Sequence, residues 1–305
     1  DLDAIATGET CGAACLRMDR YVGNGVGGFG AATAFGTPTW GSSLSLADID
    51  GDGDLDAINA GTAAGPTARL DKYVNDGTGS FAASTFGTAL QEAATTMGDI
   101  DADGDIDLVV VGEGAGPTRR LDRYMNDGAG TFAGPTAFGI GLKFPTAALA
   151  DHDADGDLDL LVSGQNQGGT NLLSRYPNSG AGAFGGPMSF GLGVLGGSMS
   201  VGDVDADGDV DLIVTGRDQS STARLDRYTN RSLAANSVPP APAGLAASNI
   251  AGRWVMRWTK VGGDDHTTSN LIRYQIAVAT QLVGIVGPFR YTSTNVAFSP
   301  NEGQG

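Results

Sequence analysis

The stretch DIDGDGDLD, residues 48–56, places five aspartates at alternate positions around a glycine at its sixth position. It recurs as DIDADGDID at 99–107, DHDADGDLD at 151–159 and DVDADGDVD at 203–211. Alternating carboxylates on a sharp glycine turn supply the hard oxygen ligands that a calcium ion requires. An acidic run can also be a solvated or disordered segment. The fixed glycine and the apolar segment after each loop favour ordered calcium loops instead.

The four acidic loops predict about four complete calcium sites with ligands at positions one, three, five, seven and nine. In the first loop, Asp48, Asp50, Asp52 and Asp56 are expected to bind through side chains, and Asp54 through its backbone carbonyl. The candidate ligands are Asp48, Asp50, Asp52, Asp54, Asp56, Asp99, Asp101, Asp103, Asp105, Asp107, Asp151, Asp153, Asp155, Asp157, Asp159, Asp203, Asp205, Asp207, Asp209 and Asp211. Extracellular calcium modules typically have dissociation constants of about 10⁻⁴ to 10⁻³ M, which suits a structural role.

The charge and composition of the chain exclude several classes of partner. The net charge is −17 over 305 residues, and the four loops contain 20 of the 35 acidic residues. Such a field repels phosphate backbones and anionic lipid, so neither nucleic acid nor a membrane surface is an expected partner. No apolar run approaches the length that spans a bilayer, so membrane insertion is not expected. The 49 glycines and short β-branched runs favour strands joined by tight turns.

The loops recur with a nearly constant period, because their seventh positions are 51, 52 and 52 residues apart. A period of this size is typical of propeller blades or another repeat array. The opening DLDAIATG matches the end of a further copy, so residues 1–235 are expected to contain five repeats, the first and the last incomplete.

Each repeat has the same order of segments after its acidic loop. An apolar strand such as DLVVVG is followed by a strand with the pattern R-L-D-R-Y, by a glycine turn such as NDGAGTF, and by a segment that ends in Phe-Gly. Strand runs joined by Asn-Asp-Gly turns predict a four-stranded antiparallel sheet in each repeat. The tyrosines and the Phe-Gly phenylalanines are expected to pack between neighbouring sheets, although a ligand-stacking role is the alternative. These phenylalanines are Phe35, Phe86, Phe138 and Phe190.

Together these motifs resemble the FG-GAP or VCBS repeats of bacterial surface proteins, which are related to the calcium-bearing blades of integrin α-subunits. The resemblance covers residues 1 to about 235. It implies an all-β protein whose blades are the four-stranded antiparallel sheets of a calcium-bearing β-propeller. It also implies a secreted or cell-surface location, in a bacterium.

The remainder of the chain differs in composition. Residues 236–243, NSVPPAPA, are expected to form a proline-rich linker. In residues 244–305, GRWVMRWTK and LIRYQIAVAT both alternate as half-buried strands do. This segment resembles the start of an immunoglobulin-like fibronectin type III sandwich. A complete domain of that class needs about 100 residues, so the segment is expected to be truncated or completed by a partner.

The only two cysteines, Cys11 and Cys15, lie in one turn of the first repeat. A local disulfide between them is expected, because calcium loops of this kind suit an oxidising exterior. A pair of free thiols is the alternative.

The expected function is a non-catalytic, calcium-stabilised extracellular scaffold or adhesion module that binds a protein or glycan on a cell surface. One alternative is a carbohydrate-binding propeller lectin that uses repeated side chains such as Arg120, Asp122 and Arg123, although these could equally form salt bridges across strands. Another is a subunit of a surface filament, in which other copies of the chain complete its sheets by strand exchange. Catalysis is not expected, because neither His152 nor His266 has a repeat equivalent or a nearby nucleophile motif.

Overall fold

The computed structural model describes residues 3–9, 16–116, 118–205, 207–230, 243–250 and 253–259. The chain divides into two compact units, Asp1–Ser232 and Leu233–Gly305. All the regular elements of the described residues are β-strands, and the strands of every sheet run antiparallel. Within these residues the structure has no helix long and apolar enough to cross a membrane.

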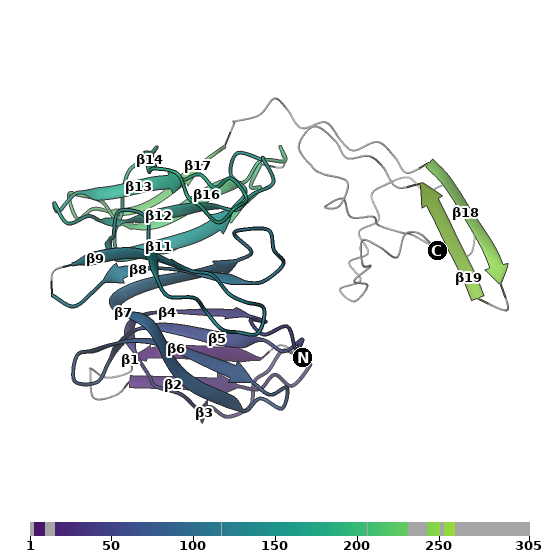
Figure 1. Cartoon of the computed structure of the whole chain (residues 1–305), viewed down its shortest axis with the longest axis horizontal. Coiled ribbons are helices and arrows are strands. Elements are labelled where there is room, and N and C mark those ends of the chain that lie inside the picture. Colours follow the sequence, from purple (N-terminus) through teal and green to yellow (C-terminus); the bar gives the residue numbers. More distant parts are fainter. Residues whose placement is uncertain are drawn as a thin grey trace. The chain divides into compact units, whose positions relative to one another are not determined.

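The first unit consists of four sheets (Figure 1). The first contains β1 (Ala4–Glu9), β2 (Leu16–Tyr21) and β3 (Thr33–Ala34). The second contains β4 (Trp40–Ala47), β5 (Asp56–Ala63), β6 (Thr67–Asn75), β7 (Phe81–Gly98), β8 (Asp107–Glu113), β9 (Arg119–Tyr124) and β10 (Thr136–Ala137). The third contains β11 (Lys143–Ala150), β12 (Asp159–Gln165), β13 (Asn171–Tyr176) and β14 (Met188–Ser189), and the fourth contains β15 (Met199–Gly202), β16 (Asp211–Arg217) and β17 (Ala223–Tyr228).

The predicted four-stranded antiparallel sheet is present in the second repeat, as β4, β5, β6 and the first part of β7, and in the third repeat, as the last part of β7, β8, β9 and β10. The second sheet has seven strands because β7 belongs to both repeats. The first part of β7 pairs with β6 up to Thr85 opposite Asp71; the register then shifts, and Leu90 lies opposite Arg69. From Gln91 onward β7 pairs with β8 of the next repeat. The connection between the two repeats thus lies within β7, where the register shifts and the N–H of Thr88 bonds to the Tyr124 hydroxyl.

The core lies between consecutive repeats. One cluster combines Ile58 and Leu70 of the second repeat with Leu108 and Tyr124 of the third, each no more than 1% exposed. The strands that follow the acidic loops are buried on both faces, as in β8 and β12, because a neighbouring repeat packs against each face. Stacked antiparallel sheets of this kind are consistent with a β-propeller.

The Phe-Gly motifs form the junctions between repeats. At one junction Phe86 contacts the edge of Tyr124, with ring centroids 5.7 Å apart, and stacks on Phe132 at 5.2 Å. The Tyr124 hydroxyl accepts a hydrogen bond of 2.8 Å from the backbone N–H of Thr88. The same tyrosine-to-backbone bond recurs at the other junctions, through Tyr73, Tyr176 and Tyr228. The prediction that these aromatic residues pack between repeats is therefore confirmed.

Glycine follows the phenylalanine because the tyrosine ring lies directly over its Cα. A Cβ added at Gly87 would lie 2.5 Å from Cε1 of Tyr124, and the backbone φ of this glycine is +58°. Both the contact and the left-handed backbone exclude a side chain at this position.

Two strands are described in the second unit, β18 (Ala243–Ile250) and β19 (Arg253–Thr259), which form an antiparallel hairpin. The predicted strand GRWVMRWTK corresponds to β19. The other predicted strand, LIRYQIAVAT, lies outside the described residues, as do His266, most of the predicted linker and the proposed disulfide between Cys11 and Cys15.

Candidate metal centres

Each acidic loop connects the first two strands of its sheet and turns tightly at its sixth position. The glycines there have φ angles between +94° and +99°, a region that other residues rarely adopt. They are Gly53, Gly104, Gly156 and Gly208. The aspartate at position one accepts the N–H of this glycine in all four loops, at 3.0 to 3.2 Å. Glycine and the first aspartate therefore fold the loop so that its carboxylates converge.

The aspartate at position nine begins the apolar strand and is 0% exposed in every loop. These residues are Asp56, Asp107, Asp159 and Asp211. In the 99–107 loop, Asp107 accepts N–H groups from Ile100 at 3.2 Å and from Asn126 at 2.8 Å. Equivalent pairs of bonds occur in the other three loops. Two backbone donors thus fix the buried carboxylate at the base of the loop.

The structure brings three of the five predicted ligands of each loop together, with ligand atoms within 4.8 Å of one another. Positions one, three and nine converge in three loops, as Asp48, Asp50 and Asp56, as Asp99, Asp101 and Asp107, and as Asp203, Asp205 and Asp211. In the 151–159 loop the group is instead Asp151, Asp153 and Asp155.

The aspartates at positions five and seven also contact backbone groups or glycine turns of their own repeats. At position five, Asp52, Asp103, Asp155 and Asp207 accept the N–H two residues onward. At position seven, the Asp105 carboxylate lies against the glycine turn of its own repeat, where a Cβ added at Gly128 would be 2.6 Å away. Asp157 lies in the same way against Gly180. The side chain at position seven is thus turned away from the converging carboxylates.

The electrostatics of the loops favour a bound cation. Burial, together with the neighbouring carboxylates, raises the pKa of Asp107 and of Asp159 to about 6. Four carboxylate oxygens in the loops are buried without a hydrogen-bond partner, on Asp50, Asp99, Asp151 and Asp153. Buried charged oxygens are costly unless they are paired or coordinate a metal. The all-oxygen donor set and these unpartnered atoms fit a hard divalent cation such as calcium.

The loops also contact the repeat that follows. In the third, fourth and fifth repeats the asparagine two residues after the strand's tyrosine donates its side-chain N–H to the carbonyl at position two of the preceding loop, at 2.6 to 2.7 Å. These bonds run from Asn126 to Ile49, from Asn178 to Ile100 and from Asn230 to His152. The order of an acidic loop is therefore coupled to the packing of the next repeat.

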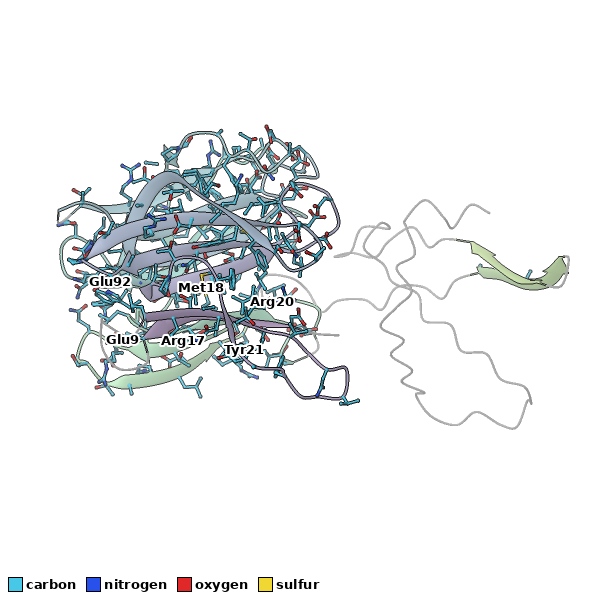
Figure 2. All side chains as sticks on the ribbon, turned by 90° about the horizontal axis from the view of Figure 1, so that it is seen from below. Glu9, Arg17, Met18, Arg20, Tyr21 and Glu92 are labelled. Atoms are coloured by element: carbon cyan, nitrogen blue, oxygen red, sulfur yellow. The ribbon has the colours of Figure 1, made fainter. Side chains whose placement is uncertain are left out.

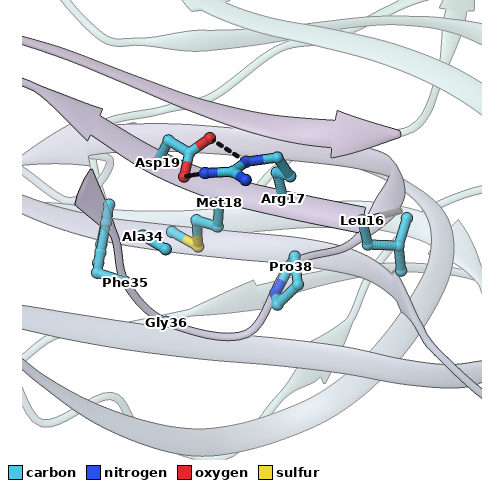
Figure 3. A pocket seen from close by; sticks show the side chains of 8 residues that line it. All are labelled: Leu16, Arg17, Met18, Asp19, Ala34, Phe35, Gly36 and Pro38. Carbon is cyan, nitrogen blue, oxygen red and sulfur yellow. Dashed lines mark hydrogen bonds and ion pairs between the residues drawn. The ribbon is translucent and has the colours of Figure 1, made fainter. Parts of the chain in front are cut away.

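The repeated arginine and aspartate of R-L-D-R-Y pair within one strand, not across strands as the sequence suggested. Arg120 donates two hydrogen bonds to Asp122, at 2.7 and 2.8 Å, and the Asp122 side chain is 0% exposed. Arg17 and Asp19 pair in the same way beside a pocket of about 130 Å³ that Phe35 and Pro38 also line (Figure 3). The guanidinium of Arg17 and the carboxylate of Asp19 thus already have each other as hydrogen-bonding partners.

Sequence reasoning missed two features of the sites. One is the asparagine of Y-x-N, whose recurrence in four repeats was the available signal. The other is Arg175, whose guanidinium lies 3.0 Å from Asp153 and 3.3 Å from Asp159. The sequence separates Arg175 from its equivalents only through its neighbours, because its strand reads LLSRY where two other repeats read RLDRY.

Stacked antiparallel sheets with an acidic loop in each repeat define a class of β-repeat proteins with candidate metal loops. A family model for FG-GAP-like repeats matches residues 1–58, 99–162 and 151–214, which together exceed half of the chain. The chain therefore belongs to the FG-GAP-like repeat family. A search of curated proteins finds no match to it.

Proposed function

We propose that the chain is a calcium-stabilised, non-catalytic scaffold or adhesion module of an extracellular or cell-surface protein. The observation that carries this proposal is the convergence of three carboxylates in each loop, with buried oxygens that lack a hydrogen-bond partner in the 48–56, 99–107 and 151–159 loops. Membership of the FG-GAP-like repeat family supports an extracellular or surface location. The partner is a protein or glycan on a cell surface.

The chain's own residues connect the loops to the architecture. Asp107 is held at the start of β8 by the N–H groups of Ile100 and Asn126, so the loop and the strand become ordered together. The Asn126 side chain then extends the connection to Ile49 in the previous repeat. A bound calcium ion would supply the positive charge that relieves repulsion among the carboxylates.

The hairpin of β18 and β19 supports a second proposal about organisation. We infer that it begins a fibronectin type III-like domain, because its strands carry the alternation expected of a sandwich sheet.

Thermal unfolding of the full chain with and without a calcium chelator tests the main proposal. At calcium concentrations about 100 times the dissociation constant, each occupied site adds about 2.7 kcal/mol to the free energy of unfolding. Chelation should therefore lower the melting temperature by several degrees, and added calcium should restore it. An unchanged melting temperature would remove the proposal.

Two variants of the 99–107 loop make the test specific. Asp101→Asn removes a converging carboxylate and should reduce the stabilisation by calcium. Asp105→Asn alters the position-seven side chain, which is turned toward Gly128, and should leave most of that stabilisation intact. Equal effects of the two variants would contradict the assignment of ligands.

A further inference from the structure

The basic residue at the fourth place of R-L-D-R-Y pairs with an aspartate of its own acidic loop in two repeats. Arg20 lies 3.5 Å from Asp3, the ninth position of the incomplete first loop, and only Arg175 pairs in this way with a complete loop among the described residues. In the first two repeats the basic residue reaches the glycine turn of the next repeat, where Arg20 donates to the carbonyl of Gly79 and Lys72 to that of Gly130. Figure 2 labels Arg20 on β2. In the third repeat, Nη1 of Arg123 lies beside Gly182 of the next turn, 3.6 Å from the position of an added Cβ. These basic side chains thus extend toward the following repeat.

Arg175 occupies this place in the fourth repeat, and the sequence at the corresponding position of the next repeat is different. The turns that Arg20, Lys72 and Arg123 approach have the sequences NDGTGSF, NDGAGTF and NSGAGAF, each with two glycines. After Tyr228 the chain reads TNRSLAAN, without a glycine. Arg175 turns instead toward the acidic loop of its own repeat.

Its guanidinium forms ion pairs with Asp153 at 3.0 Å and with Asp159 at 3.3 Å, and its side chain is 15% exposed. Asp153 is position three of the loop and Asp159 is position nine, so both are candidate calcium ligands. Among the described residues, no lysine or arginine forms an ion pair with a carboxylate of the 48–56, 99–107 or 203–211 loop. The 151–159 loop is also the one in which position nine is absent from the converging group.

We propose that Arg175 is an internal cation that makes the 151–159 loop the weakest calcium site of the four. Calcium binding there must break two ion pairs and bring a divalent ion close to a positive charge, and both effects oppose binding. The same ion pairs offset part of the negative charge of the loop when calcium is absent. This loop therefore depends least on calcium for its order and releases the ion first as the calcium concentration falls.

The inference rests on the proposed function, because it presupposes that the other three loops bind calcium. Calcium binding to the full chain, measured by titration calorimetry and equilibrium dialysis, tests it. We expect three ions to bind with similar affinity and a fourth to bind at least tenfold more weakly. Asp151→Asn should abolish only the weak phase and so assign it to the 151–159 loop.

Arg175→Met should strengthen the fourth site at least tenfold and should lower the melting temperature in chelator, because the loop then has no counter-charge. Arg123→Met is the matched control, since Arg123 has the same place in the repeat and no ion pair with its loop, and it should change neither quantity. Arg175→Lys retains the charge without the fork of the guanidinium, so its effect on affinity should be smaller than that of Arg175→Met.

Four equivalent sites in the wild type would overturn this inference while leaving the proposed function intact. The same holds for an Arg175→Met variant whose fourth site is unchanged. No calcium uptake by any variant would instead overturn the proposed function.

Discussion

Substitution of Gly87 by alanine tests how the repeats are joined. The new Cβ would lie 2.5 Å from Cε1 of Tyr124, whose side chain is 1% exposed and therefore has no room to move. Overpacking of this kind costs about 1 to 3 kcal/mol, and the φ of +58° adds about 1 kcal/mol for a residue with a Cβ. The free energy of unfolding should therefore fall by about 2 to 4 kcal/mol.

Guanidinium unfolding in saturating calcium, followed by intrinsic fluorescence, measures this loss. Gly169→Ala is the matched control, because Gly169 has a φ of +81° but no atom within 4 Å of an added Cβ. The control should lose only about 1 kcal/mol. If Gly87→Ala cost no more than Gly169→Ala, the close approach of Tyr124 would not be the reason for glycine in the Phe-Gly motif.

Three further predictions concern single groups. Tyr124→Phe should cost about 1 kcal/mol in the same assay, because it leaves the partly buried N–H of Thr88 without its acceptor. An unchanged midpoint would contradict the role of that bond. Arg120→Ala should lower the unfolding midpoint more than Arg224→Ala, because the side chain of Asp122 is 0% exposed whereas that of Asp226 is 19% exposed; equal losses would count against the buried pair. In calcium-free buffer the melting temperature should rise as the pH falls from 7 to 5. The reason is that the pKa of Asp107 and of Asp159 is raised to about 6 in the folded chain, above the value of 3.8 for an unfolded carboxyl, so protonation over this range relieves the cost of burying their charge. A falling melting temperature over this range would contradict this prediction.

Much of the architecture could be predicted because the repeat is visible in the sequence. The period of the aspartate loops indicated stacked sheets, and the recurrence of tyrosine and Phe-Gly indicated the junctions. The continuity of β7 could not be predicted, because its two parts pair with strands of different repeats, β6 and β8.

The candidate sites were predictable in position but not in detail. Alternation of aspartates identifies the loops, yet which carboxylates converge depends on backbone hydrogen bonds such as those to Asp107. Arg175 pairs with Asp153 and Asp159 of its own loop, whereas Lys72 at the equivalent place donates to a carbonyl of the next repeat. Which of these partners a basic side chain takes cannot be deduced from the pattern of the repeat.

The central claim is that the converging carboxylates of the acidic loops bind calcium. Anomalous scattering from crystals of the full chain grown in calcium tests this claim most directly. We predict a calcium peak enclosed by the carboxylates at positions one, three and nine of the 48–56, 99–107 and 203–211 loops, and a weaker peak in the 151–159 loop. Well-ordered loops without anomalous peaks at saturating calcium would contradict the account.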